Sequence, residues 1–160
     1  MKKQSQDSRR VVLHVEDDDS TAYLFRYALE RSGIDMHVFR ATDGEQGLSF
    51  LLRRGAYRDA PRPDLVILDI NVPKVSGFEV LDIIRSRQEL KDLPVVVFSS
   101  SMETEDWKRA LSLGARAYFT KSGDWMAFLA TVKSICDLVP EHGRYIAARQ
   151  APISDAHPSH

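Results

Sequence analysis

Short apolar runs alternate with amphipathic stretches along the whole chain. Runs rich in apolar residues predict strands at residues 11–15, 35–40, 65–68, 95–98 and 116–119. The third and fourth runs are apolar without alternation, which is typical of parallel strands covered on both faces. A helical pattern follows each run. We therefore predict an α/β fold with a doubly wound five-stranded parallel sheet, in the strand order 2-1-3-4-5.

The predicted helices carry apolar stripes at spacings of three and four residues. Thr42 to Glu45 matches a capping box that opens a helix running to about Arg54, and Ser100 with Glu103 could cap the fourth helix. Residues 55–63, rich in Gly and Pro, predict an extended loop. The expected buried stripes are Leu48, Leu51 and Leu52 in the second helix, Phe78, Leu81 and Ile84 in the third, Trp107, Ala110 and Leu111 in the fourth, and Phe128, Leu129, Val132, Ile135, Cys136 and Val139 in the last.

One folded domain accounts for the length of 160 residues. We expect a polar leader at residues 1–9, the domain at 10–139 and a tail at 140–160. The tail is expected either to be mobile or to join two copies in a homodimer through Tyr145, Ile146 and Ile153.

Charge and composition exclude several functions. The net charge of −1 and the pI of about 6.5 argue against binding to nucleic acid or to an anionic membrane. No apolar stretch approaches the roughly 20 residues of a membrane span, and the first ten residues lack the apolar centre of a secretory signal. The single Cys136 cannot form an internal disulfide. We expect a cytoplasmic protein, and we expect His14 to be a core residue with its hydrogen bonds satisfied.

Polar residues end four of the predicted strands. These are Glu16 and Asp17 after the first, Asp69 after the third, Ser99 after the fourth and Lys121 after the fifth. A single aspartate there would more often be a helix cap, but in a parallel sheet all these ends meet at one edge. Three carboxylates at 4 Å repel by about 4 kcal/mol per pair at an effective dielectric constant near 20. Lys121 and a hard cation such as Mg²⁺ would offset this repulsion.

Such a site suits phosphoryl transfer to Asp69. With a metal ion and Lys121 neutralising the phosphoryl oxygens, the carboxylate can attack phosphorus and form an acyl phosphate. Ser99 could then turn inward to donate a hydrogen bond, and Tyr118 could fill the vacated space. Asn71 and Ser101 lie where a hydrolytic water would approach, so they could set the lifetime of the phosphoryl group.

These residues resemble the motifs of the receiver domain of two-component response regulators, over about residues 9 to 139. The spacings agree, since 30 residues separate Asp69 from Ser99 and 22 separate Ser99 from Lys121. The resemblance implies a flavodoxin-like receiver fold and a phosphohistidine of a sensor histidine kinase as donor. It implies Asp69 as phosphoacceptor, Ser99 and Tyr118 as switch residues, Lys121 as the family lysine, and Mg²⁺ held by Asp17, Asp69 and the Asn71 carbonyl, with Glu16 acting through water.

Residues 50–64 and 97–101 are similar to a narrower group, the stand-alone regulators that partner bacterial phytochrome kinases. Members of that group often dimerise, and a stand-alone regulator is expected to pass its signal by contact with a downstream protein or by onward phosphotransfer. The sequence departs from the family where Ser122 follows Lys121, because the family usually has a proline in a cis bond there. A cis bond before serine costs about 2.5 to 4 kcal/mol. We predict a trans bond or a reshaped loop, which could displace Lys121 from Asp69.

Two other functions remain open from the residues. Aspartate-nucleophile phosphatases also use an aspartate at a strand end with lysine and magnesium. Their motif resembles Asp-x-Asp, in which the second aspartate acts as general acid and base. Asn71 occupies that second position here and cannot take this role. The chain could also be a receiver-like module that binds partners without phosphorylation.

Overall fold

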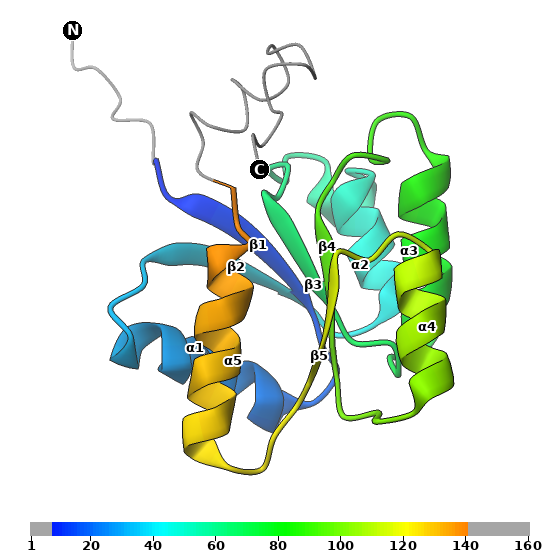
Figure 1. Cartoon of the computed structure of the whole chain (residues 1–160). Helices are drawn as coiled ribbons and strands as arrows, with labels where there is room; N and C mark the ends of the chain where they lie inside the picture. The colour runs from blue at the N-terminus through cyan, green and yellow to red at the C-terminus, as the bar shows by residue number, and fades with distance from the viewer. Residues whose placement is uncertain (1–7, 141–160) are drawn as a thin grey trace, which may run out of the picture.

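Five parallel strands lie between two layers of helices in the computed structural model, which describes residues 8–140 (Figure 1). The expectations for residues 1–7 and for Tyr145, Ile146 and Ile153 fall outside the described residues. The strands are β1 (Arg10–Val15), β2 (Met36–Ala41), β3 (Leu65–Leu68), β4 (Val95–Ser99) and β5 (Ala117–Thr120). The helices are α1 (Asp19–Arg31), α2 (Gly44–Leu51), η1 (Gly55–Tyr57, 3₁₀), α3 (Gly77–Ser86), α4 (Thr104–Ser112) and α5 (Trp125–Asp137).

The predicted strand order is confirmed as β2-β1-β3-β4-β5, with every pairing parallel. Helices α1 and α5 cover one face of the sheet, and α2, α3 and α4 cover the other (Figure 1). β3 is buried along its whole length because it is the middle strand. Alternate side chains therefore enter two cores, so that Leu13 and Val15 face α2 and α3 while Val12 packs with α1 and α5. The domain boundaries at residues 10 and 139 stay a prediction.

Helix α2 begins and ends differently from the prediction. The N-cap is Asp43, whose carboxylate accepts a hydrogen bond from the Gln46 backbone, whereas the predicted cap was Thr42. Thr42 instead donates to the Gln46 side chain. The helix ends at Leu51 instead of running to Arg54, because Arg53 adopts a left-handed φ of 54° that no helix can continue.

Helix α4 also differs from the prediction. Of its expected stripe only Ala110 is buried, while Trp107 and Leu111 are 46% and 38% exposed. The expected cap by Ser100 is wrong as well, because Ser101 Oγ accepts the hydrogen bond from the Glu103 backbone and no side chain caps the helix from Glu103. The helix covers the edge of the sheet near β5 and leaves an aromatic side chain in solvent.

His14 is buried as expected, but its hydrogen bonds are not satisfied. Its side chain is 1% exposed and its ring lies 4.8 Å from the ring of Phe25. Nε2 has no hydrogen-bond partner among residues 8–140. Burial lowers the pKa of His14 to about 3, and the nearby positive charge of Lys121 acts in the same direction. His14 is therefore a neutral core residue beneath the edge where the strands end.

The loop between β3 and α3 is held closely against its neighbours by two glycines. A Cβ at Gly77 would lie 2.5 Å from the Asp69 carbonyl oxygen and 2.5 Å from Ile70 Cα. A Cβ at Gly44 would lie only 1.8 Å from the Val75 carbonyl oxygen. The Gly44 amide also donates to the Pro73 carbonyl at 3.2 Å. The loop of residues 70–76 can therefore pack this closely only because Gly44 and Gly77 have no side chain.

We predict that Gly77→Ala lowers the free energy of unfolding by about 2 kcal/mol or more, as overpacking against rigid backbone does. Gly123→Ala is the matched control, since a Cβ there would meet nothing within 4 Å. Urea denaturation of both variants measures the difference. Equal stabilities of the two variants would show that the loop can move away from Gly77 without cost.

Candidate functional site

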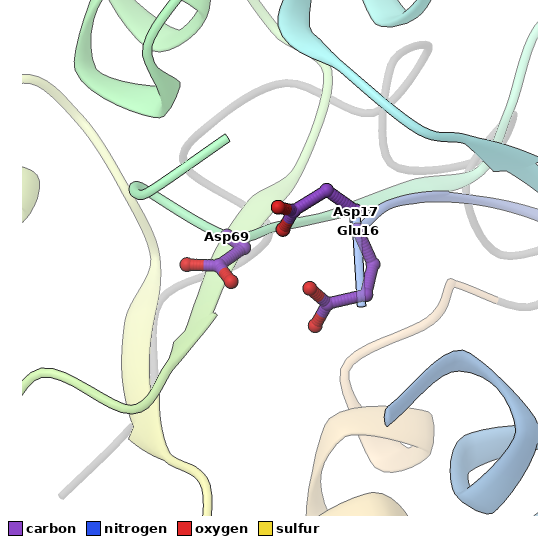
Figure 2. Close-up of side chains that lie close together, drawn as sticks. All are labelled: Glu16, Asp17 and Asp69. Atoms are coloured by element: carbon purple, nitrogen blue, oxygen red, sulfur yellow. The ribbon is translucent and has the colours of Figure 1, made fainter. Parts of the chain in front are cut away.

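Three carboxylates converge at the carboxyl edge of the sheet. Glu16, Asp17 and Asp69 each present an oxygen, and these atoms lie within 4.8 Å of one another. Figure 2 shows the three side chains directed toward the same space, Glu16 and Asp17 from the end of β1 and Asp69 from the end of β3. Glu16 and Asp69 are buried and Asp17 is exposed. The cluster thus has a buried floor and an open side toward solvent.

Backbone hydrogen bonds of the sheet hold the carboxylates in place. The Glu16 amide donates to the Ala41 carbonyl at 2.9 Å, and the Asp69 amide donates to the Val15 carbonyl at 3.1 Å. These bonds continue the ladders past the ends of β1 and β3. Asp69 Oδ1 accepts from the Asn71 amide at 3.0 Å, so Asp69 caps no helix and its other oxygen is available to a cation.

Lys121 provides that cation. Its Nζ lies 2.8 Å from Asp69 Oδ2 and 2.6 Å from Glu16 Oε1. Its amide donates to the Ser99 carbonyl at 2.8 Å, which extends the pairing of β4 and β5 by one residue. The described residues contain no cis peptide bond, so the predicted trans bond before Ser122 is confirmed. The expectation that Lys121 could be displaced is wrong, because the backbone pairing of β4 with β5 continues to Lys121 and places its ammonium group beside Asp69.

Burial and charge perturb two ionisable groups of the cluster. Burial raises the pKa of Glu16 to about 7, although Lys121 opposes this shift. Burial alone would lower the pKa of Lys121, but its hydrogen bonds to Asp69 and Glu16 outweigh this and hold that pKa above its ordinary value. Lys121 therefore stays charged at neutral pH. At neutral pH and without a further cation, Glu16 is therefore protonated in part of the molecules.

The predicted switch residues form a connected group beside the cluster. Ser99 is fully buried, and its Oγ accepts from the Ser101 amide at 3.3 Å. Tyr118 is partly buried, and its hydroxyl donates to the Ser101 carbonyl at 2.8 Å. Ser101 Oγ donates to Asp106 in α4. The Ser101 side chain thus makes its hydrogen bonds with the first turn of α4 and the residue before it.

Sequence reasoning missed two contributors to this site, Asp106 and Arg40. Asp106 binds Ser101, as described. Arg40, the fifth residue of β2, pairs in register with His14, and its Nε donates to the Glu16 carbonyl at 3.0 Å. The predicted strand order, in which β2 neighbours β1, contained the signal for Arg40. No local pattern pointed to Asp106.

The cluster fits a hard divalent cation. All three of its donors are carboxylate oxygens, which are ligands of Mg²⁺ and Mn²⁺. Three carboxylates face one ammonium group, so a net negative charge remains for a cation to offset. The site is therefore an acidic metal site. No helix within residues 8–140 has the length and hydropathy needed to cross a bilayer.

An acidic metal site at the carboxyl edge of a 2-1-3-4-5 parallel sheet, with a lysine against the central aspartate, defines a phosphoacceptor class of signalling protein. The chain belongs to the response regulator receiver domain family, whose model matches residues 12–133. It is a receiver domain of two-component signalling.

The chain is similar to several known receivers. It is 36% identical over 126 residues to "Response regulator Rcp1" of Synechocystis sp., a match that covers 79% of this chain and 86% of that protein. The structure of the phosphorylated cyanobacterial phytochrome response regulator RcpA has 35% identity and a TM-score of 0.77, over 82% of this chain and 94% of that one. The bacteriophytochrome response regulator RtBRR has 36% identity and a TM-score of 0.68, over 79% and 78%. The resemblance to the phytochrome-associated group is confirmed.

We predict that Asp17→Asn weakens Mn²⁺ binding by about tenfold or more, since one of the clustered carboxylates is lost. Asp17 is exposed, so the metal-free variant should unfold at the wild-type temperature. Isothermal titration calorimetry measures the affinity. Asp124→Asn, which alters an aspartate at the start of α5 outside the cluster, is the control and should bind Mn²⁺ as the wild type does. Unchanged affinity in Asp17→Asn would place the ion elsewhere.

Proposed function

We propose that this chain accepts a phosphoryl group on Asp69 from a phosphohistidine of a sensor histidine kinase. The observation that carries the proposal is the position of Asp69. Its buried carboxylate lies 2.8 Å from the Lys121 ammonium and within the group of oxygens formed with Glu16 and Asp17. A cation and an ammonium group on either side of one carboxylate suit transfer of a group whose oxygens are anionic.

The metal ion we propose is Mg²⁺. Asp17, Asp69 and the Asn71 carbonyl would hold it, and Glu16 would act through water. When bound, Mg²⁺ would neutralise charge on the oxygens of the incoming phosphoryl group and help to orient it. Its preference for oxygen ligands and retained waters matches a site that is open on the Asp17 side.

The reaction forms one bond and breaks one bond. One oxygen of the Asp69 carboxylate attacks phosphorus, and the bond from phosphorus to the histidine nitrogen breaks, with its electron pair remaining on the imidazole. Lys121 keeps its proton and neutralises a phosphoryl oxygen. The product is an acyl phosphate on Asp69, which water can later hydrolyse.

The switch would begin at Ser99 and Tyr118. A phosphoryl oxygen would draw the Ser99 hydroxyl toward Asp69 and away from the Ser101 amide, and Tyr118 would follow. Asn71 and Ser101 would tune hydrolysis. The Ser101 hydroxyl would do so by fixing the loop before α4, because Asp106 holds it.

We predict that Asp69→Asn abolishes labelling by the small-molecule donor acetyl phosphate in the presence of Mg²⁺. The amide cannot form an acyl phosphate, and the substitution keeps the size of the side chain. Phosphate-affinity electrophoresis measures the labelling, with Asp124→Asn as a control that alters the helix cap of α5 outside the cluster. Labelling that persists in Asp69→Asn would move the acceptor elsewhere, and sustained multiple turnover of phosphomonoesters by the wild type would favour a phosphatase.

The kinase we propose is of the phytochrome type, and we propose that it docks beside the site on α1 and the start of α5. Tyr23 and Met126 are 67% and 68% exposed there, and Tyr27 and Leu24 are more than one third exposed. The Tyr27 ring lies 5.4 Å from that of Trp125, so the two helices form one surface. Both helices begin at the carboxyl edge of the sheet (Figure 1), the edge at which the carboxylate cluster lies. Apolar side chains gathered there can bind a helical partner.

We predict that Met126→Asp slows phosphotransfer from a purified phytochrome-type kinase by about tenfold, because a charge in an apolar interface is costly. Labelling by acetyl phosphate should not change, since the chemistry is intact. Leu111→Asp is the control, because Leu111 is 38% exposed on α4, away from this surface, and should leave both rates within twofold. Slow labelling by both donors would indicate a damaged site, and an unchanged kinase rate would remove this surface as the docking site.

A further inference from the structure

Arg40 holds the segment that carries Asp17 from both sides. Its Nε donates to the carbonyl oxygen of Glu16 at 3.0 Å, and its Nη1 lies 2.8 Å from Oδ1 of Asp19. The first contact precedes Asp17 by one residue, and the second follows it by two. Asp17 is thus bracketed by two contacts from one side chain on the neighbouring strand.

Three other restraints act on this segment: the Asp18 amide donates to Glu16 Oε2 at 3.3 Å across Asp17, and two further contacts act at its ends. The Glu16 amide is bonded to Ala41, and Asp18 caps α1 by accepting from the Thr21 amide. Asp17 itself is exposed and lies between these anchors. The Arg40 side chain, only 21% exposed, adds the contacts that span the segment.

A guanidinium group suits this role because its donors are fixed in one plane. Nε and Nη1 can reach a carbonyl and a carboxylate together, whereas a lysine offers one flexible ammonium. The Asp19 carboxylate is 92% exposed, so its ion pair alone contributes little. The effect on Asp17 comes from the two contacts acting together.

We propose that Arg40 is a positioning residue for the metal ligand Asp17. It fixes the backbone from Glu16 to Asp19 so that the Asp17 carboxylate points toward Asp69 before the cation arrives. This inference rests on the proposed function, since it takes the cluster to be the site of a divalent cation. Groups that orient metal ligands without touching the metal commonly affect affinity by tenfold or more.

The charge of Arg40 predicts the opposite effect, which makes the test decisive. A positive charge near the cluster repels a divalent cation, so by charge alone Arg40→Gln would bind the cation more tightly and Arg40→Lys would bind it equally well. By positioning, both variants bind it more weakly, because both lose the planar pair of donors. For Arg40→Gln the two explanations predict changes in cation affinity of opposite sign. For Arg40→Lys one predicts no change in affinity and the other predicts weaker binding.

The experiment is a Mn²⁺ titration of the full chain, followed by electron paramagnetic resonance of the free ion. We expect Arg40→Lys and Arg40→Gln to weaken binding on the order of tenfold. Arg26→Lys is the matched control, because Arg26 also donates a guanidinium hydrogen bond to the backbone of β2, at Val38, but does not contact the Glu16 to Asp19 segment. It should bind Mn²⁺ within twofold of the wild type.

Wild-type affinity in Arg40→Lys, or tighter binding in Arg40→Gln, would overturn the role of Arg40 and leave the proposed function intact. A wild type that binds no Mn²⁺ would instead remove the proposed function itself. Amide hydrogen exchange at Asp17 in the metal-free protein is the second measurement. Faster exchange in Arg40→Lys supports the proposal, and equal exchange contradicts it, whatever the effect on thermal stability.

Discussion

The attraction between one ammonium group and two buried carboxylates is the interaction on which this site depends. Glu16 has no exposed surface, and burying a carboxylate without a partner would cost several kcal/mol. Lys121 lies within 2.8 Å of both Glu16 and Asp69, so one side chain partners both. Three carboxylates and one ammonium still leave a negative charge. The same geometry that makes the fold tolerate Glu16 therefore makes the site attract a cation.

The parallel sheet makes this arrangement possible. Strands β1, β3 and β5 are far apart in the chain, but their carboxyl ends meet at one edge of the sheet (Figure 1). Below that edge the sheet is apolar, and even His14 is kept neutral by burial. Electrostatic attraction is stronger in such surroundings than in water. The close fit of Gly77 against the Asp69 backbone keeps the following loop from moving the carboxylate.

Apolar periodicity was enough to predict the five strands and their order, and the ends of the strands were enough to place Asp69 and Lys121 at the same edge of the sheet. Their direct contact was left in doubt, because Ser122 replaces the proline that usually follows the lysine. Contacts between distant segments could not be predicted in this way. Trp107 has the spacing of a buried residue but lies at the edge of its helix layer, where its neighbours in the described part of the chain leave it 46% exposed. The cap of α2 moved from Thr42 to Asp43 because tertiary contacts, such as the approach of Gly44 to Pro73, set where the helix begins. Local patterns contain no information on such contacts.

The hydrogen bonds around Ser101 connect the buried site to the surface. The Ser101 amide donates to Ser99 inside the site, its carbonyl accepts from Tyr118, and its hydroxyl donates to Asp106 on the exposed helix α4. A change at Ser99 therefore acts first on the backbone of a residue that also binds α4. Because α4 buries only Ala110 among its own residues, little apolar packing opposes a shift of this helix. A small movement at the proposed phosphorylation site would thus change the α4 surface without disturbing the core.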